Sequence, residues 1–206
     1  MRRSKMARYK INEIFYSLQG EGYYTGTAAV FIRFSGCNLA CPWCDTKHQE
    51  GEFMEDYEIV SQALACCGGA APLVVLTGGE PSLFVDEDFI DLLSKHFDIV
   101  AMESNGTYRA PRNLDFLTVS PKADYLPKPG TPVVAQKCSE VKVVYDGEHD
   151  PEPWFQFFQA RHAYLQPCDV GDPERNAQIL SDCIRYIQTH AWWRLSLQTQ
   201  KIINVR

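Results

Sequence analysis

Apolar runs of strand length recur along the chain and are separated by segments with helical spacing. A run of four to eight apolar residues between turn signals is typical of a strand buried on both faces of a parallel sheet. A more loosely alternating stretch, 9–16, comes before them. The predicted strands are 28–35, 73–77, 99–102, 116–119, 141–145, 163–165 and 193–197.

Helices are predicted between these strands, at 57–67, 86–97, 153–160 and 174–190. The alternation favours a parallel sheet with right-handed crossovers. A closed barrel of eight such units needs about 250 residues, and this chain has 206. We therefore expect an α/β fold, a partial and laterally open (β/α)6-type barrel, formed by one domain over 1–206.

Polar or glycine-rich segments directly follow most of the predicted strands. In parallel sheets, ligand sites gather at the carboxyl ends of the strands. The sequence therefore predicts one site built from several separate segments. These segments are Gly78-Gly79-Glu80-Pro81, Glu103-Ser104-Asn105-Gly106-Thr107, Ser120-Pro121-Lys122, Gln166-Pro167-Cys168-Asp169 and Gln198-Thr199-Gln200.

The strand at 28–35 leads into Cys37, Cys41 and Cys44, which have C-x3-C-x2-C spacing. A closed zinc site uses four protein ligands. A cubane iron–sulfur cluster held by three thiolates leaves one iron open to a small chelating molecule. The spacing favours the cluster. The alternatives are an incidental run of cysteines, or a zinc knuckle that borrows a distant fourth ligand.

Two further features admit both a structural and a functional interpretation. Arg33 interrupts an apolar strand, so its charge either forms an internal salt bridge or faces a polar cavity and binds a substrate carboxylate. The polar turn 17–22 is either a hairpin connection or a means of presenting Gln19 and Glu21 to a heterocycle.

Composition argues against a nucleic-acid-binding, membrane-spanning or secreted protein. The net charge of −6 does not suggest a nucleic-acid partner, and no apolar run has the length of a membrane span. The basic segment 1–6 is not followed by an apolar stretch, so it is not a secretory signal. The other five cysteines form no second C-x2-C pair, and no disulfide framework is expected. A cytoplasmic location is consistent with these features.

Several segments between Leu18 and Arg206 together resemble the 7-carboxy-7-deazaguanine synthase family of radical S-adenosylmethionine (SAM) enzymes. They are Ser-Leu-Gln-Gly-Glu-Gly at 17–22, Phe-Ile-Arg-Phe-Ser-Gly-Cys-Asn-Leu at 31–39, Cys-Asp-Thr at 44–46, Thr-Gly-Gly-Glu-Pro at 77–81 and Leu-Gln-Thr-Gln-Lys at 197–201. The radical SAM part of the resemblance also includes Ser-Pro-Lys at 120–122.

The resemblance implies a reaction and its cofactors. The family contracts 6-carboxy-5,6,7,8-tetrahydropterin to 7-carboxy-7-deazaguanine with loss of ammonia, on the route to queuosine and other deazapurines. A [4Fe-4S] cluster, SAM and Mg²⁺ are implied as cofactors. The implied partners are a flavodoxin or ferredoxin as electron donor and a second copy of the chain in a homodimer.

The resemblance also implies roles for individual residues. Cys37, Cys41 and Cys44 would hold the cluster, and Thr46 would ligate magnesium. The SAM site would comprise Trp43, Cys44, Asp45, Gly79, Glu80, Ser120, Pro121, Lys122, Gln166, Pro167, Cys168 and Asp169. In that site, Trp43 would stack on the adenine and Glu80 would receive the amine. The pterin site would comprise Leu18, Gln19, Gly20, Glu21, Arg33, Thr77, Gln200 and the terminal carboxylate of Arg206.

Gln200 departs from the family pattern, which usually has a histidine at this position. Glutamine keeps hydrogen-bonding capacity but carries no charge near neutral pH. Two other functions compete with the leading one: a radical SAM enzyme that activates a glycyl-radical enzyme, and a metal-binding module without catalysis. Gln19, Arg33 and the C-terminal residues argue against the first, and cluster spectra unchanged by SAM would favour the second.

Overall fold

The computed structural model of the chain describes residues 7–44, 46, 49–122, 132–135, 137–158 and 160–205. Its strands are β1 Arg8–Leu18, β2 Ala28–Phe34, β3 Glu52–Glu55, β4 Leu73–Gly78, β5 Ile99–Ser104, β6 Phe116–Val119, β7 Glu140–Tyr145, β8 His162–Pro167 and β9 Arg194–Leu195. Its helices are α1 Asp56–Cys67, the 3-10 turn η1 Pro81–Leu83, α2 Glu87–Leu93, α3 Glu152–Phe158, α4 Pro173–Thr189 and α5 Thr199–Ile202.

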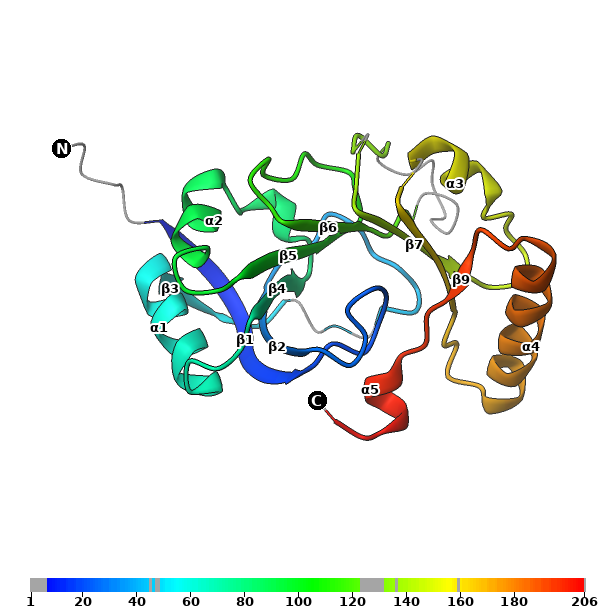
Figure 1. Cartoon of the computed structure of the whole chain (residues 1–206), viewed down its shortest axis with the longest axis horizontal. Helices are drawn as coiled ribbons and strands as arrows, with labels where there is room; N and C mark the ends of the chain where they lie inside the picture. Colours follow the sequence, from blue (N-terminus) through cyan, green and yellow to red (C-terminus); the bar gives the residue numbers. More distant parts are fainter. Residues whose placement is uncertain are drawn as a thin grey trace.

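The strands form one curved sheet in the order β3-β1-β2-β4-β5-β6-β7-β8-β9, with helices packed along its outer side (Figure 1). Neighbouring strands from β2 to β9 are all parallel. The sheet is open, which confirms the predicted partial barrel. β1 pairs antiparallel with β2, so the turn at 17–22 is part of a hairpin connection.

Three local predictions were wrong at the edges of this fold. β3 and α5 were not predicted, because their four residues form neither an apolar run nor a clear hydrophobic period, unlike the equally short but apolar β6. The predicted strand 193–197 shortens to the two residues of β9, since Trp193 N–H closes a turn onto the His190 carbonyl. The helix predicted at 86–97 ends at Leu93, and hydrogen-bonded turns follow it.

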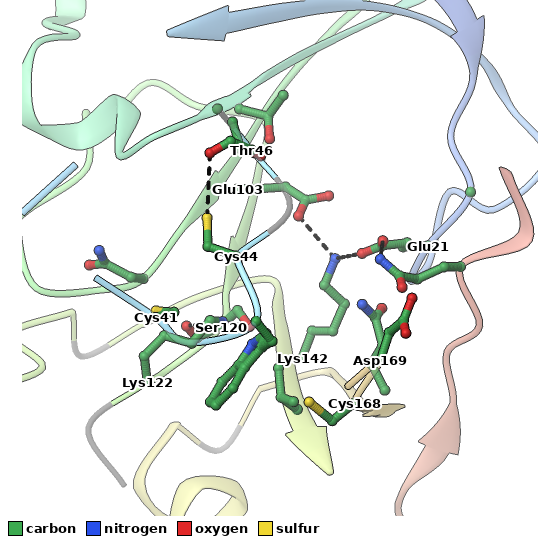
Figure 2. Close-up of a pocket in the computed structure, with 18 of the residues that line it drawn as sticks. Glu21, Cys41, Cys44, Thr46, Glu103, Ser120, Lys122, Lys142, Cys168 and Asp169 are labelled. Atoms are coloured by element: carbon green, nitrogen blue, oxygen red, sulfur yellow. Dashed lines mark hydrogen bonds and ion pairs between the residues drawn. The ribbon is translucent and has the colours of Figure 1, made fainter. Parts of the chain in front are cut away.

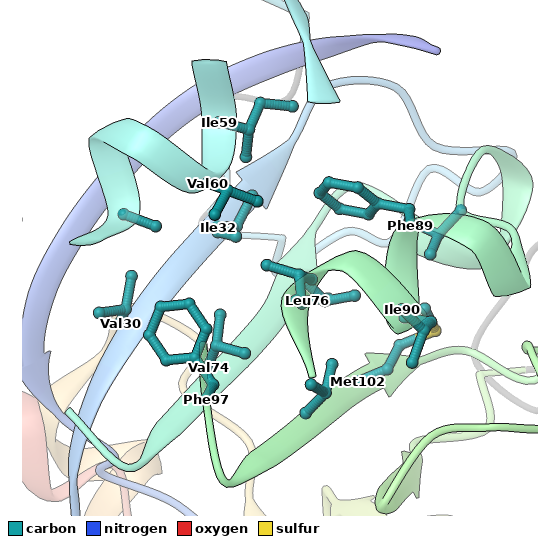
Figure 3. Packing of buried hydrophobic residues seen from close by; sticks show 14 of the residues in the cluster. Val30, Ile32, Ile59, Val60, Val74, Leu76, Phe89, Ile90, Phe97 and Met102 are labelled. Carbon is teal, nitrogen blue, oxygen red and sulfur yellow. The ribbon is translucent and has the colours of Figure 1, made fainter. Parts of the chain in front are cut away.

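The alternation of side chains along the strands separates an outer core from the barrel interior. Val30 and Ile32 on β2, with Val74 and Leu76 on β4, pack outward against α1 and α2 (Figure 3). The intervening residues point inward. Toward the amino ends of the strands they form a second apolar cluster, which includes Phe31. Further along the strands, inward positions include Arg33 on β2, Glu103 on β5 and Lys142 on β7, so the fold places charged groups inside the barrel.

A bulge in β1 changes which side chains of that strand face inward. The pairing of β1 with β2 shifts between Ile11 and Glu13. Ile11 packs in the outer core with Phe34, its partner on β2. After the shift, Glu13 pairs with Arg33, and Phe15 joins the inner cluster. One extra residue in a strand has this effect because side chains alternate with a period of two.

A separate outer core forms where α3 and α4 cover β7 and β8. Its buried members include Val143, Leu165 and Cys183. Asp172 caps the N-terminus of α4, because its carboxylate accepts hydrogen bonds from the N–H groups of Glu174 and Arg175. Within the described part of the chain, no helix combines the length and apolar character that a bilayer crossing requires.

Candidate active site

A cavity of about 640 Å³ lies at the carboxyl ends of the parallel strands (Figure 2). Every predicted site residue that the structure describes lines it, with the exception of Pro121. Asp45 and Arg206 lie outside the described residues. The predicted residues in the lining are Leu18, Gln19, Gly20, Glu21, Arg33, Cys37, Cys41, Trp43, Cys44, Thr46, Thr77, Gly79, Glu80, Ser120, Lys122, Gln166, Pro167, Cys168, Asp169 and Gln200.

The cysteine loop, residues 37–44, forms one side of this cavity. Cys37 and Cys41 are half-buried, Cys44 is exposed, and all three are free thiols. The Leu39 N–H lies 3.4 Å from the Cys37 sulfur, and hydrogen bonds of this kind tune cluster thiolates. No three His, Cys, Asp or Glu side chains of the described chain are grouped as a ready metal site. The three free thiols at this spacing suit a three-thiolate cluster.

Gly79 brings the loop after β4 against the loop that leads to the cysteines. A methyl group on Gly79 would run into the Gly36 carbonyl oxygen. The next residue, Glu80, donates its N–H to that same carbonyl at 2.8 Å. The close approach therefore requires glycine at position 79.

Glu80 is 1% exposed, and its carboxylate joins the loops after β4 and β5. Oε1 accepts hydrogen bonds from the Ser82 N–H at 3.1 Å, the Ser82 hydroxyl at 2.6 Å and the Ser104 hydroxyl at 2.8 Å. Oε2 accepts from the Asn105 N–H at 2.6 Å. The carboxylate therefore has a clear structural role, and its contact with the SAM amine stays a prediction.

Lys122 is half-buried on the same side of the cavity as Cys41 (Figure 2). Its ammonium donates to the Ser120 carbonyl at 2.9 Å and to the Ser120 hydroxyl. Burial lowers the pKa of Lys122 to about 8; Cys41 opposes this shift, and Lys142 adds to it. The side chain thus brings a positive charge close to the cysteine loop.

Arg33 forms the internal salt bridge and also faces the cavity, and its contact with a substrate carboxylate stays a prediction. Its Nε donates to Glu13 Oε1 at 2.9 Å, which is the internal salt bridge. Its Nη1 donates to Thr46 Oγ1 at 3.3 Å, and the side chain also lines the cavity. In the sheet, Arg33 lies directly beside Thr77. Two residues predicted to hold the pterin are therefore neighbours at the ends of β2 and β4.

Lys142 was missed by the sequence analysis, although it lines the cavity from β7. Its ammonium lies 2.6 Å from Glu21 Oε2 and 2.9 Å from Glu103 Oε2. A signal was available, because a lysine between Val141 and Val143 interrupts an otherwise apolar strand in the same way as Arg33. Glu103 belonged to a segment expected near the site, but no role was assigned to it.

The C-terminal segment closes the wall beside the β1–β2 turn, and Figure 1 shows α5 next to that turn. The Thr199 N–H donates to the Gly20 carbonyl at 3.1 Å. The side-chain amides of Gln198 and Gln200 donate to Glu21 Oε1 at 3.1 and 3.2 Å. Gln200, which departs from the family pattern, thus contacts a predicted pterin residue.

Known proteins resemble this chain over nearly its whole length. Residues 31–125 match the Radical SAM superfamily. The 7-carboxy-7-deazaguanine synthase of Bacteroides thetaiotaomicron is 46% identical over 197 residues, 96% of this chain and 98% of that protein. The enzyme of the same name from Nitratidesulfovibrio vulgaris is 37% identical over 220 residues, which cover 96% of this chain and 99% of that protein. The crystal structure of QueE from Escherichia coli has a TM-score of 0.71 at 30% identity, covering 92% of this chain and 93% of that one.

Proposed function

The chain belongs to the 7-carboxy-7-deazaguanine synthase family of radical SAM enzymes, and we propose that its cavity contracts the ring of 6-carboxy-5,6,7,8-tetrahydropterin to 7-carboxy-7-deazaguanine with loss of ammonia. The observation that carries this proposal is that the cysteine loop and the predicted pterin residues line one cavity. The comparisons give no support to the alternative, activation of a glycyl-radical enzyme.

Membership of the radical SAM family implies a [4Fe-4S] cluster and SAM. We assign the cluster to Cys37, Cys41 and Cys44; when bound, it supplies the electron that cleaves SAM. Lys122, Gln166 and the other residues of the predicted SAM set line the cavity together with these thiols. Their task is to hold SAM against the cluster and to keep water away from the reacting groups.

The pterin belongs, in this proposal, between the β1–β2 turn and the ends of β2 and β4. Arg33 is placed to bind the substrate carboxylate, because its guanidinium lines the cavity and is held by Glu13. Thr46 offers a hydroxyl beside Arg33, and we assign Mg²⁺ to it. A divalent cation and a guanidinium near one carboxylate would together fix the orientation of the ring.

Three further assignments follow the family and belong to the proposal. They are a homodimer, a flavodoxin or ferredoxin as electron donor, and a cytoplasmic location in a route to queuosine or another deazapurine. The free state of all eight cysteines in the structure is consistent with a reducing compartment.

An anaerobic assay tests the function directly. The protein is reconstituted with iron and sulfide, then given SAM, Mg²⁺, a reductant and the carboxy-tetrahydropterin. We expect the ultraviolet absorption of the deazaguanine product, and its mass by spectrometry. Protein with an intact cluster that cleaves SAM but makes no deazaguanine would overturn the assignment. A matched reaction without Mg²⁺ tests the magnesium assignment separately.

A further inference from the structure

The floor of the cavity contains a buried lysine with no role in the function proposed above. Its side chain, that of Lys142, is only 5% exposed and lies between two carboxylates, as Figure 2 shows. Glu21 Oε2 is 2.6 Å from the ammonium, and Glu103 Oε2 is 2.9 Å from it. These three charged groups come from the β1–β2 turn, β5 and β7.

Each carboxylate is also held at its other oxygen. Glu103 Oε1 accepts from the side-chain amide of Gln19 at 3.0 Å. Glu21 Oε1 accepts from Gln198 and Gln200. The Gln19 amide is fixed in turn, because its oxygen accepts from the N–H groups of residues 20 and 21. We call this set the floor network: Gln19, Glu21, Glu103, Lys142, Gln198 and Gln200.

The stability of the fold does not account for such an arrangement. Buried ion pairs are often no more stable than apolar residues of similar volume, because charges lose their hydration on burial. The exposed fractions of these three side chains point instead to a role in binding a ligand from the cavity. The side chains of Glu21 and Glu103 are 15% and 26% exposed, whereas that of Lys142 is 5% exposed. The two glutamate side chains are therefore more open to solvent than the lysine side chain between them.

Lys142 also keeps the Glu21 carboxylate charged. Two carboxylates in a buried site do not both ionise readily unless a positive charge compensates them. Burial by itself would raise the pKa of Glu21, but attraction to Lys142 outweighs this and lowers the pKa to about 2. Burial would lower the pKa of Lys142, but Glu103 and Glu21 raise it. At neutral pH the Glu21 carboxylate is therefore ionised and can accept hydrogen bonds.

We propose that Lys142 is a positioning residue, which fixes the carboxylates of Glu21 and Glu103 as two acceptors for the N–H groups of the substrate's heterocycle. The inference rests on the proposed function, because pterins and deazaguanines share an aminopyrimidinone ring with N–H and amine donors. A carboxylate offers about four acceptor positions. The described residues occupy two of them on Glu103, so this carboxylate has capacity for a ligand.

The first test compares Lys142→Met with Lys95→Met, a matched change at an exposed lysine. Both proteins are reconstituted, and KM for the pterin, kcat, cluster content and the unfolding midpoint are measured. We expect Lys142→Met to raise KM about 10- to 100-fold, the equivalent of a lost hydrogen bond to a charged group, with cluster content unchanged. Lys95→Met should leave all four quantities unchanged. An unchanged KM in folded Lys142→Met would overturn the inference.

The double variant Lys142→Met/Glu103→Gln separates positioning from mere charge balance, and it also serves if the single variant does not fold. It removes one charge of each sign from the floor network. We expect its unfolding midpoint to return toward that of the wild type while KM stays at least about tenfold raised. A wild-type KM in the double variant would show that Lys142 only neutralises charge, and would overturn the inference.

A binding measurement distinguishes failure of this inference from failure of the proposed function. The probe is 7-carboxy-7-deazaguanine, titrated anaerobically into the reconstituted wild type and into Lys142→Met. Weaker binding by the variant supports the inference. Product formation by the wild type with equal binding by both proteins overturns the inference alone. A wild type that neither makes nor binds the deazaguanine overturns both.

Discussion

The cysteine loop and the floor network face the same cavity, but they are organised differently. The loop carries free thiols that are half-buried to exposed. The floor holds a 5% exposed lysine between two carboxylates, each tied at its other oxygen. A metal cluster binds thiolates strongly and imposes its own geometry on them. A heterocycle makes weaker bonds, so the protein has to arrange its partners in advance. Under the proposed assignments, the difference reflects how much geometry each ligand brings with it.

Replacement of a thiol in the cysteine loop should have the largest effect on activity and little effect on the fold. We expect Cys41→Ser to lower activity by more than about 10³-fold, because the cluster loses one of its three ligands. Unfolding of the cluster-free protein should stay within about 0.5 kcal/mol of the wild type, since Cys41 is only half-buried.

Iron content, product formation and denaturant unfolding measure this outcome. Cys66→Ser is the matched control, because that thiol is exposed on α1, away from the cavity. If Cys41→Ser unfolds while Cys66→Ser does not, the loop contributes to the folded core and the contrast with the floor is wrong.

Lys142→Met should strongly lower the stability of the fold, whereas Cys41→Ser should leave it nearly unchanged. Removal of one partner from a buried ion pair leaves an uncompensated charge, which costs about 3–5 kcal/mol. Here two carboxylates lose their compensating ammonium. The free energy of unfolding, measured with urea, should fall by this amount, whereas Lys95→Met should change little. A loss below about 1 kcal/mol would mean that the floor is not preorganised by charge.

The floor network should also make stability depend on acid. The pKa of Glu21 is lowered from 4.5 to about 2 in the folded protein. A lowered pKa stabilises the fold above the ordinary value of 4.5, and this contribution disappears as the pH falls toward 2. Over that range the unfolding free energy of the wild type should fall about 2–3 kcal/mol further than that of Glu21→Gln. Parallel pH profiles for the two proteins would contradict the assignment.

A pair outside the cavity should show the smallest effect and calibrates the others. Arg175 lies 3.2 Å from Glu148, and their side chains are 45% and 71% exposed. Exposed pairs of this kind contribute about 0–1 kcal/mol, since water screens both charges. We expect Arg175→Ala to change the free energy of unfolding by less than about 0.5 kcal/mol and to leave activity unchanged. A larger loss would show that charge removal in general, rather than the floor, explains the effect of Lys142→Met.

The sequence was sufficient for the parts of this protein that depend on local pattern. Apolar runs separated by helical segments predicted the parallel strands, and the cysteine spacing identified the loop. Polar segments after the strands predicted a shared cavity, because parallel strands place their carboxyl ends at one edge. The hairpin connection at 17–22 was one of the two interpretations that the sequence allowed for that turn, and the structure contains it. In each case the information lies within a few consecutive residues.

Only the tertiary structure decided how the interior charges are paired. Lys142 is 121 residues from Glu21 and 39 from Glu103 in sequence, so no local pattern links these side chains. The bulge between Ile11 and Glu13 likewise changes which residues of β1 face Arg33. Strand alternation determines that a side chain points inward. Its partner depends on which strands become neighbours and how they align, and these are properties of the assembled sheet.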